Sequence, residues 1–286
     1  MRIHLLINVH RAEAIEAGRK TVQLLRDHQI AVGADHESAG FVGAESVSNH
    51  NLADCDLMIG FGGDGTLIRA AHLCSERGTP ILGVYYGSFG FVTQCTGDEL
   101  GAALSDFFDG KAHFEDRMML QADLIRHGDC IATVHALNEL VLQRPVTDRM
   151  MVFGVIVEDK QLTSYPADGV MVATPTGSTG YNLSAGGPIA DPMLRMMILS
   201  AVAPHTLSAR TLILRPESKV ELTLETEGDA VLSADGQTRL HLLTHDSVRV
   251  SQSPRVTRLM VIDKSDFLNK LHERLFWSHS FARGKR

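Results

Sequence analysis

The period of the hydrophobic pattern changes along the chain, and this change limits the folds that the chain can adopt. In the first third, apolar runs typical of strands, such as Ile3–Val9 and Leu57–Phe61, alternate with segments of helical spacing. That order predicts an α/β region with parallel strands. From about residue 114 the period is two, as in Val220–Glu225, where apolar and polar residues alternate. The second region is therefore predicted to be mostly β.

Local signals indicate where elements of the first region begin and end. A helix is expected to begin near Thr66 and to stop at Gly78–Pro80, because glycine can adopt the left-handed cap and proline cannot continue a helix. A strand at Ile81–Val84 should follow. Thr96–Glu99 fits a capping box at the start of a further helix, which Gly110 is expected to close.

A length of 286 residues suits two domains or one large one. Because the period changes, we expect an α/β domain at residues 1–112 and a β-rich domain at residues 113–261. The final segment, 262–286, is predicted to form a helix that Ser265 can cap and that returns to the first domain. The apolar face of this helix is predicted to contain Leu268, Leu271 and Leu275.

The charge balance of the chain is acidic, with a formal net charge of -7. A protein that binds the phosphates of nucleic acid normally carries a basic excess or a basic stripe, so nucleic acid is not expected as a partner. The basic cluster at the C-terminus, which we interpret as a solvated tail, consists of Arg283, Lys285 and Arg286.

Several features predict a cytoplasmic protein. The cysteines show neither CxxC spacing nor a histidine at zinc-binding spacing, so we expect reduced thiols at Cys55, Cys74, Cys95 and Cys130. Met1 leads into an apolar strand-like run without a basic segment and a cleavage site. Since no stretch is long enough to span a bilayer, no membrane association is expected.

The loop Gly62-Gly63-Asp64-Gly65-Thr66 lies where an apolar strand ends and a helix begins, which is the usual ligand position in α/β folds. Glycines let the backbone approach a phosphate, and the N–H groups at a helix N-terminus favour negative charge. An aspartate beside phosphate is unfavourable unless it accepts a proton or holds a metal, so Asp64 is the candidate catalytic residue. The alternative is a tight turn in which Asp64 only caps the helix.

Two further segments carry candidate binding residues. Thr174–Pro188, which follows Asp168-Gly169, is dense in glycine and hydroxyl residues and holds Tyr181, whose flat ring can lie against a base. Asn138-Glu139 interrupts an apolar run, and a carboxylate and an amide there can bind ribose hydroxyls. The alternatives are a long loop with several turns and an exposed strand end.

These motifs resemble the NAD kinase family, in which GGDGT, NE and DG…TPTGSTAYxLSAGGP occur in this order at similar separations. The resemblance spans most of residues 57–240. It also includes the shorter segments Arg117–Leu120, Pro204–Ser208 and Asp235-Gly236.

The resemblance implies an enzyme that transfers phosphate from ATP, or from polyphosphate, to the 2′-hydroxyl of the adenosine ribose of NAD. Mg²⁺ or another divalent metal ion would be the cofactor, and NADP the product. It implies a Rossmann-like N-terminal domain that binds the phosphate donor, a mostly β C-terminal domain that binds NAD, and a homodimer or homotetramer.

The resemblance also implies roles for individual residues, none of them a metal ligand. Asp64 would activate the ribose hydroxyl. The residues expected to face phosphates or to bind nucleotide in the first motif are Gly62, Gly63, Gly65 and Thr66. Those expected around NAD or nucleotide in the others are Asn138, Glu139, Asp168, Thr176, Thr179, Gly180, Tyr181 and Ser184.

Two positions depart from the family pattern, which often has asparagine at Tyr85 and alanine at Gly180. Both are expected to alter how the substrate is held. Arg69 and Arg144 are candidates for compensating phosphate charge, with ordinary surface charges as the alternative. Two other functions stay open: a lipid kinase of the diacylglycerol or sphingosine type, which the first motif alone permits, and a non-catalytic NAD-binding sensor.

Overall fold

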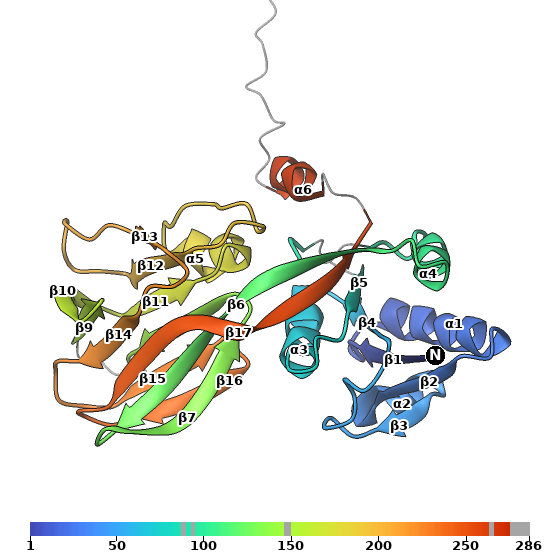
Figure 1. The fold of residues 1–286 in the computed structure, drawn as a ribbon, viewed down its shortest axis with the longest axis horizontal. Helices are drawn as coiled ribbons and strands as arrows, with labels where there is room; N and C mark the ends of the chain where they lie inside the picture. Colours follow the sequence, from blue (N-terminus) through green and yellow to red (C-terminus); the bar gives the residue numbers. More distant parts are fainter. Residues whose placement is uncertain (87–89, 93–94, 146–149, 263–265, 275–286) are drawn as a thin grey trace, which may run out of the picture. The chain divides into compact units, whose positions relative to one another are not determined.

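The computed structural model describes residues 1–86, 90–92, 95–145, 150–262 and 266–274. The chain forms two compact units (Figure 1). Unit 1 comprises Met1–Glu115 together with Arg258–Arg286, and unit 2 comprises Asp116–Thr257. No helix in the described part of the chain is both long enough and apolar enough to cross a membrane. The four cysteines are free, as predicted.

Unit 1 contains a parallel sheet with the strand order β5-β4-β1-β2-β3. Its strands are β1 (Arg2–Ile7), β2 (Ala31–Asp35), β3 (Glu45–Val47), β4 (Leu57–Gly62) and β5 (Ile81–Tyr85). β4 and β5 pair in parallel, with Met58 opposite Ile81. The residues of β4 are all buried, which is why this strand is a continuous apolar run rather than an alternating one. The α/β pattern predicted for the first region is confirmed.

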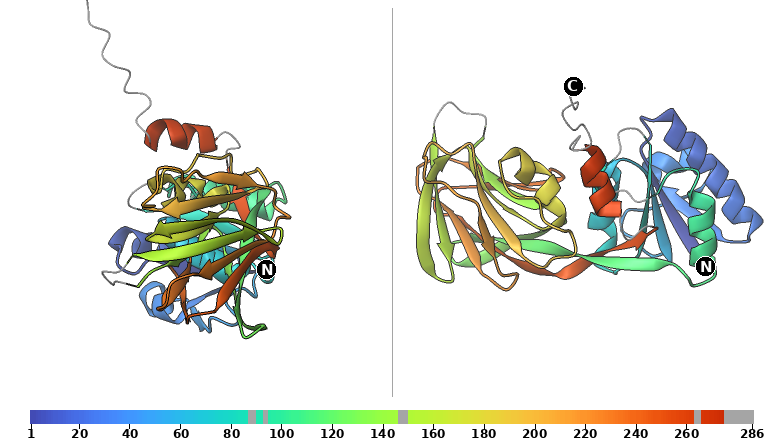
Figure 2. Two further views of the ribbon diagram at one scale, coloured as in Figure 1. Left: turned by 90° about the vertical axis from the view of Figure 1, so that its left-hand side faces the viewer. Right: turned by 90° about the horizontal axis from the view of Figure 1, so that it is seen from above.

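The helices of unit 1 cover both faces of this sheet (Figure 2). They are α1 (Ala12–Asp27), α2 (His36–Val42), α3 (Asp64–Cys74) and α4 (Leu100–Phe108). Val22 and Leu25 of α1 and Leu104 of α4 belong to one core cluster with residues of the sheet. In the right-hand view of Figure 2, α3 lies on the opposite face from α1 and α4.

The predicted ends of α3 need one correction. The helix begins at Asp64, two residues before Thr66, because Gly63 is already the N-cap. Its regular part ends at Cys74, and a last turn runs to Gly78, which has a φ of 69°. The N–H of Thr79 donates to the carbonyl of Cys74, which is the bond that closes a helix at a left-handed glycine. The stop at Gly78 was therefore predicted correctly.

The capping box predicted before α4 forms only in part, because the N-cap is Glu99, without a side-chain cap bond, rather than Thr96. The N–H of Thr96 donates to the Glu99 carboxylate at 2.8 Å, and its hydroxyl donates to the same oxygen at 2.7 Å. The helix begins at Leu100, and Gly110, with a φ of 69°, follows its end. Residues between β5 and α4 at 87–89 and 93–94 lie outside the described part.

Unit 2 is built from antiparallel strands, as the period of two predicts. One sheet has the order β13-β12-β11-β8-β15-β16; the other strands of the unit pair in the order β10-β9-β14-β17, with β6 beside β17 and β7 beside β6. The bounds are β6 (His113–Arg126), β7 (Asp129–Ala136), β8 (Glu139–Gln143), β9 (Met151–Val157), β10 (Lys160–Ala167), β11 (Gly169–Ala173), β12 (Met197–Val202), β13 (Leu212–Leu214), β14 (Val220–Leu224), β15 (Ala230–Ala234), β16 (Thr238–Leu242) and β17 (Ser247–Val261). Two short helices, the 3-10 helix at Thr176–Thr179 and α5 (Tyr181–Ser184), follow β11.

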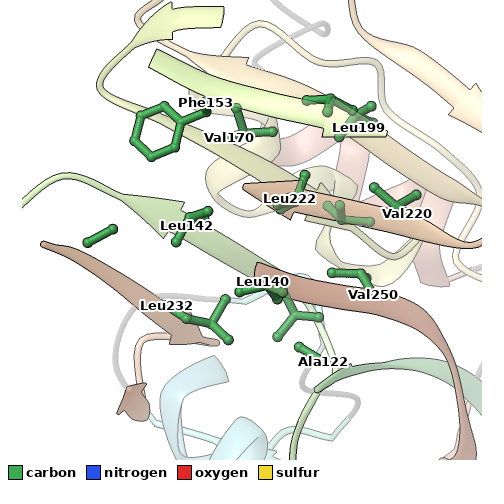
Figure 3. Close-up of a cluster of buried hydrophobic side chains, with 14 of the residues drawn as sticks. Ala122, Leu140, Leu142, Phe153, Val170, Leu199, Val220, Leu222, Leu232 and Val250 are labelled. Atoms are coloured by element: carbon green, nitrogen blue, oxygen red, sulfur yellow. The ribbon is translucent and has the colours of Figure 1, made fainter. Parts of the chain in front are cut away.

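The core of unit 2 lies between these layers (Figure 3). Val220, Leu222 and Leu224 are buried, whereas Glu221 and Thr223 between them are only partly buried. The buried residues belong to the same cluster as Leu140 and Leu142 of β8 and Leu199 of β12. Alternate side chains of strands from both sheets therefore supply one core, which holds β8 and β11 rigidly in place.

The last described helix, α6 (Asp266–Arg274), is grouped with unit 1. Leu268 and Leu271 are three residues apart and therefore share a face, as predicted. On that face Leu271 is buried, whereas Leu268 is 68% exposed. Lys270, next to Leu271 in sequence, is also buried, so the buried part of the helix surface contains these two residues and excludes Leu268. Ser265 and Leu275 lie outside the described residues.

Candidate functional site

The Gly62–Thr66 loop connects a fully buried strand to the N-terminus of α3. Gly63 is the N-cap, and no side chain among the described residues caps the helix. Asp64 is the first helical residue, where a carboxylate interacts favourably with the helix dipole. Its oxygens accept hydrogen bonds from the backbone N–H groups of Phe91 (2.9 Å) and Val92 (3.1 Å). Asp64 is therefore held by a segment distant in sequence and does not simply cap its own helix.

Gly90 lies directly against the carboxylate of Asp64. A Cβ atom added at Gly90 would collide with both carboxylate oxygens, so only glycine leaves room for this approach. Tyr85, where the family often has asparagine, is the last residue of β5 and donates its N–H to the carbonyl of Cys95. The β5 end thus places the 90–92 segment beside the loop that carries Asp64.

The glycines of the loop differ in what surrounds them. A Cβ atom at Gly62 would collide with the hydroxyl of Thr66, so packing explains this glycine. An added Cβ atom at Gly63 or at Gly65 would meet no atom of the described residues within 4 Å. Gly65 lies inside a helix, where glycine costs about 1 kcal/mol relative to alanine. Neither glycine is required by packing, whereas both leave the helix N-terminus open to an approaching phosphate.

Leu137 and Asn138 connect β7 to β8, whose first residue is Glu139. Asp235, in the hairpin between β15 and β16, holds this turn in place. The Asp235 carboxylate accepts hydrogen bonds from the N–H groups of Leu137 (2.7 Å), Asn138 (2.8 Å) and Glu139 (2.9 Å). The N–H of Asp235 in turn donates to the carbonyl of Glu139. Three donors in succession thus converge on one carboxylate, which fixes the backbone of the turn.

The Thr174–Pro188 segment packs against this turn. The N–H of Thr174 donates to the carbonyl of Asn138 at 2.8 Å. A Cβ atom at Gly177 would collide with the backbone of Asn138, and one at Gly180 would lie 3.1 Å from Oε2 of Glu139. The structure therefore brings two of the predicted motifs into direct contact, with Gly180 beside the Glu139 carboxyl group.

Three polar atoms of these motifs are buried without a hydrogen-bond partner among the described residues: Asn138 Oδ1, Glu139 Oε2 and Thr176 Oγ1. Leaving a buried polar group unsatisfied costs about 1–3 kcal/mol, so such atoms need a specific reason. Hydroxyl and amide groups of a bound ligand would satisfy all three. The predicted NE and TPTGST motifs thus supply the atoms that a polar ligand requires.

Burial, as the largest cause, and the negative charge of Asp235 together raise the pKa of Glu139 from 4.5 to about 7, although a hydrogen bond from the N–H of Tyr181 lowers it in part. A carboxyl group with this pKa exchanges its proton near neutral pH. It can therefore donate a hydrogen bond to a ligand in one state and accept one in the other.

Other predicted residues lie in different surroundings. The Thr179 hydroxyl donates to the carbonyl of Thr176, while Tyr181 is 41% exposed and Ser184 is exposed. Asp168 precedes β11 and pairs with Arg144 at 2.9 Å. Because Gly169 pairs with Gln143 and Ala173 pairs with Glu139, Asp168 lies at the opposite end of β11 from Glu139. Asp168 is thus not part of the cluster around Glu139.

Arg69 forms ion pairs with acidic side chains of its own unit. Its guanidinium group lies 2.8 Å from the buried carboxylate of Asp35 and 3.7 Å from that of Glu37. Arg69 therefore behaves as a structural cation, in line with the simpler of the two readings of the sequence.

Sequence reasoning missed the residues that hold the motifs in place. Asn182 is fully buried and donates to the carbonyls of Ser178 (3.2 Å) and Pro188 (3.1 Å), while its Oδ1 accepts from the Ser200 hydroxyl. Its burial inside a polar segment carries no local signal. Asp235-Gly236 was noted only as part of the family resemblance, although an Asp-Gly pair between apolar runs also predicts a hairpin. Its three-fold hydrogen bonding to residues 137–139 was not foreseeable.

Comparison with known proteins agrees with the motifs. Residues 3–112 match the model of the ATP-NAD kinase N-terminal domain, and residues 137–262 match that of the ATP-NAD kinase C-terminal domain. The chain belongs to the NAD kinase family. NAD kinase from Desulforamulus reducens is 36% identical over 96% of both chains. NAD kinase from Caldanaerobacter subterraneus is 33% identical over 96% of this chain and 98% of its own.

Solved structures of NAD kinases share the fold. The yeast NADH kinase complexed with NADH superposes with a TM-score of 0.93 at 22% identity, covering 100% of this chain and 90% of its own. An NAD kinase from Archaeoglobus fulgidus, in complex with ATP, gives 0.73 at 24% identity, covering 94% and 96%. The predicted fold class and the predicted family are both confirmed. The chain is accordingly an enzyme of the NAD kinase family.

Proposed function

We propose that this NAD kinase family member transfers the γ-phosphoryl group of ATP to the 2′-hydroxyl of the adenosine ribose of NAD, giving NADP and ADP. The observation that carries the proposal is the cluster of buried, unpartnered atoms on Asn138, Glu139 and Thr176. Ribose hydroxyls and amide groups of a dinucleotide supply the donors and acceptors that these atoms lack. The family and the placement of Asp64 in an open glycine loop support the same reaction.

In this proposal Asp64 acts as the general base. Its carboxylate accepts the proton of the 2′-hydroxyl while the ribose oxygen attacks the γ-phosphorus in line with the departing ADP oxygen. The N–H groups of Phe91 and Val92 orient the carboxylate before the substrate binds. Orientation of this kind lowers the entropic part of the barrier, because the base needs no further ordering at the moment of transfer.

The open glycines and the uncapped N-terminus of α3 are proposed to receive the phosphates of the donor. Gly63 and Gly65 present backbone without side chains, and the helix dipole favours an anion there. Asn138, Glu139 and Thr176 of unit 2 are proposed to bind the NAD.

We further propose that Mg²⁺ arrives on the phosphates of ATP. Magnesium in nucleotide enzymes is usually held by one or two carboxylates, waters and the substrate phosphates. Over the described ranges, no group of three or more His, Cys, Asp or Glu side chains is arranged to hold a metal ion. The bound ion would neutralise phosphate charge.

The first test is formation of NADP from NAD, ATP and Mg²⁺ by the wild-type protein and by Asp64→Asn. We expect the variant to lose activity by at least a hundredfold while its NAD affinity, measured by calorimetry, stays within about twofold, because asparagine keeps the shape but accepts no proton. The exposed Asp106→Asn is the matched control, with the same change of charge in the same unit, and should keep full activity.

Two outcomes would contradict the proposal. A wild-type protein that binds NAD but forms no NADP would be a sensor rather than a kinase. An active Asp64→Asn variant would require another base. Replacement of ATP by polyphosphate in the same assay identifies the donor, and replacement of NAD by a diacylglycerol tests the lipid-kinase alternative.

A further inference from the structure

Asp235 has an environment that an ordinary hairpin residue does not require. Its φ of 51° lies in the left-handed region, where aspartate is tolerated but glycine and asparagine are more favourable. The side chain is only 9% exposed. Its carboxylate accepts the N–H groups of three consecutive residues, 137–139, at 2.7–2.9 Å. An asparagine would suit the turn as well but cannot accept all three bonds.

These three bonds join segments that are almost a hundred residues apart in sequence. They end on the two residues, Asn138 and Glu139, whose side chains carry buried and unpartnered oxygens. Fixing the backbone N–H groups of a turn fixes the direction in which its Cβ atoms point. The orientation of both unpartnered oxygens therefore depends on the Asp235 carboxylate.

Asp235 also acts on Glu139 through its charge. A carboxylate near another carboxyl group makes ionisation of that group less favourable. The groups that face Glu139 are Asp235 from the hairpin, the N–H of Tyr181 from α5 and Ala173 opposite it on β11. Of these only Asp235 carries charge, and it favours the protonated, hydrogen-bond-donating state of Glu139.

We propose that Asp235 is a positioning residue that holds Asn138 and Glu139 in the orientation needed to bind the dinucleotide and that, together with burial, favours the hydrogen-bond-donating state of Glu139. This inference rests on the proposed function. It assigns Asp235 to binding of the acceptor substrate rather than to chemistry or to binding of the phosphate donor.

The test is Asp235→Asn in the full-length protein, with steady-state kinetics and calorimetric titration with NAD between pH 5.5 and 8.5. Asparagine can still accept two of the three bonds through one oxygen, but its amide nitrogen faces the N–H of Leu137. We expect KM for NAD and the dissociation constant of NAD to rise about tenfold, as for loss of a hydrogen bond to a charged group. KM for ATP should change less than twofold.

The pH profile separates this role from a merely structural one. With the Asp235 charge removed, the pH dependence of NAD binding should shift to lower pH, because Glu139 then ionises more easily. In Glu139→Gln the pH dependence should disappear, and addition of Asp235→Asn should produce no further shift. Asp229→Asn, an exposed aspartate just before β15, is the matched control and should leave every parameter unchanged.

An NAD affinity within twofold of wild type and an unmoved pH profile in folded Asp235→Asn would overturn the inference. If that variant does not fold, Asp235→Ser keeps an acceptor oxygen, removes the charge and decides the question by the same readouts. Failure of the proposed function is distinguishable. In that case the wild type makes no NADP, yet the calorimetric comparison of NAD binding still tests Asp235.

Discussion

Glu139 combines burial, an unpartnered oxygen and a neighbouring negative charge in one side chain. Its Oε2 is buried without a partner among the described residues, and its pKa is raised to about 7. Gly180 lies beside this oxygen, and a Cβ atom added there would stand 3.1 Å from it. A methyl group there, as in many family members, requires the carboxyl group to shift by a few tenths of an ångström. Gly180 therefore adjusts the position of Glu139 directly.

The raised pKa predicts how stability depends on pH. Between pH 4.5 and about 7 the folded protein holds a proton on Glu139 that the unfolded chain has released, so the free energy of unfolding falls as pH rises through this window. Glu139→Gln removes this dependence. Its stability relative to wild type should rise over the window by an amount on the order of 3 kcal/mol.

The measurement is urea unfolding of ligand-free protein at several pH values. The exposed Glu227→Gln is the matched control, and its difference from wild type should stay flat. A flat difference for Glu139→Gln as well would mean that this carboxyl group ionises normally in the folded protein.

At the scale of elements, the first turn of α3 contains a residue that lowers helix stability. Gly65 is its second residue, is exposed and has open space around the position of a Cβ atom. The same is true of Gly101, the second residue of α4, which lies away from the proposed site. Glycine is unfavourable at both positions, and only in α3 does a proposed ligand explain its presence.

This pair allows a prediction with an internal control. Gly65→Ala and Gly101→Ala should each raise the free energy of unfolding by about 0.5–1 kcal/mol, because alanine is the better helix former. Only Gly65→Ala should raise KM for ATP, by about fivefold or more, since its methyl group stands where a phosphate approaches. Equal ATP kinetics in the two variants would show that the loop does not receive the donor.

At the scale of the whole molecule, the chain passes twice from one unit to the other. The boundaries fall within β6 (His113–Arg126) and β17 (Ser247–Val261), so each strand contributes residues to both units. Unit 2 also exposes several large apolar side chains, among them Leu207, which is 96% exposed in the Pro204–Ser208 segment. Contiguous apolar patches mark protein interfaces, whereas single exposed apolar side chains are common on any surface.

The family resemblance implies a homo-oligomer, and Leu207 offers a position at which to test this prediction. We expect the protein in solution to have the mass of a homodimer or homotetramer, measured by sedimentation at micromolar concentration. Leu207→Asp should lower the mass or weaken association by about tenfold or more, because a charge would be buried in the contact. The exposed Leu162→Asp on β10 tests whether any added charge has this effect. A wild-type monomer would contradict the expectation.

Much of the fold and of the candidate site could be predicted from consecutive residues. The apolar run of β4, the glycine loop after it and the Gly78 stop of α3 are local patterns, and each has the predicted place. The alternation in β14 likewise predicts its buried face. Such features follow from backbone geometry within a few residues, so the sequence alone is sufficient for them.

The contacts that give the site its chemistry were decided by the tertiary structure. Asp64 meets N–H groups 27 and 28 positions later, and Asp235 meets N–H groups 96 to 98 positions earlier. In the register of β8 and β11, Glu139 pairs with Ala173, and Asp168 lies at the opposite end of β11. Strand register depends on packing across both sheets, and no local pattern encodes it. The sequence alone therefore determined which residues are candidates for the chemistry, while packing between distant segments determined which of them lie together.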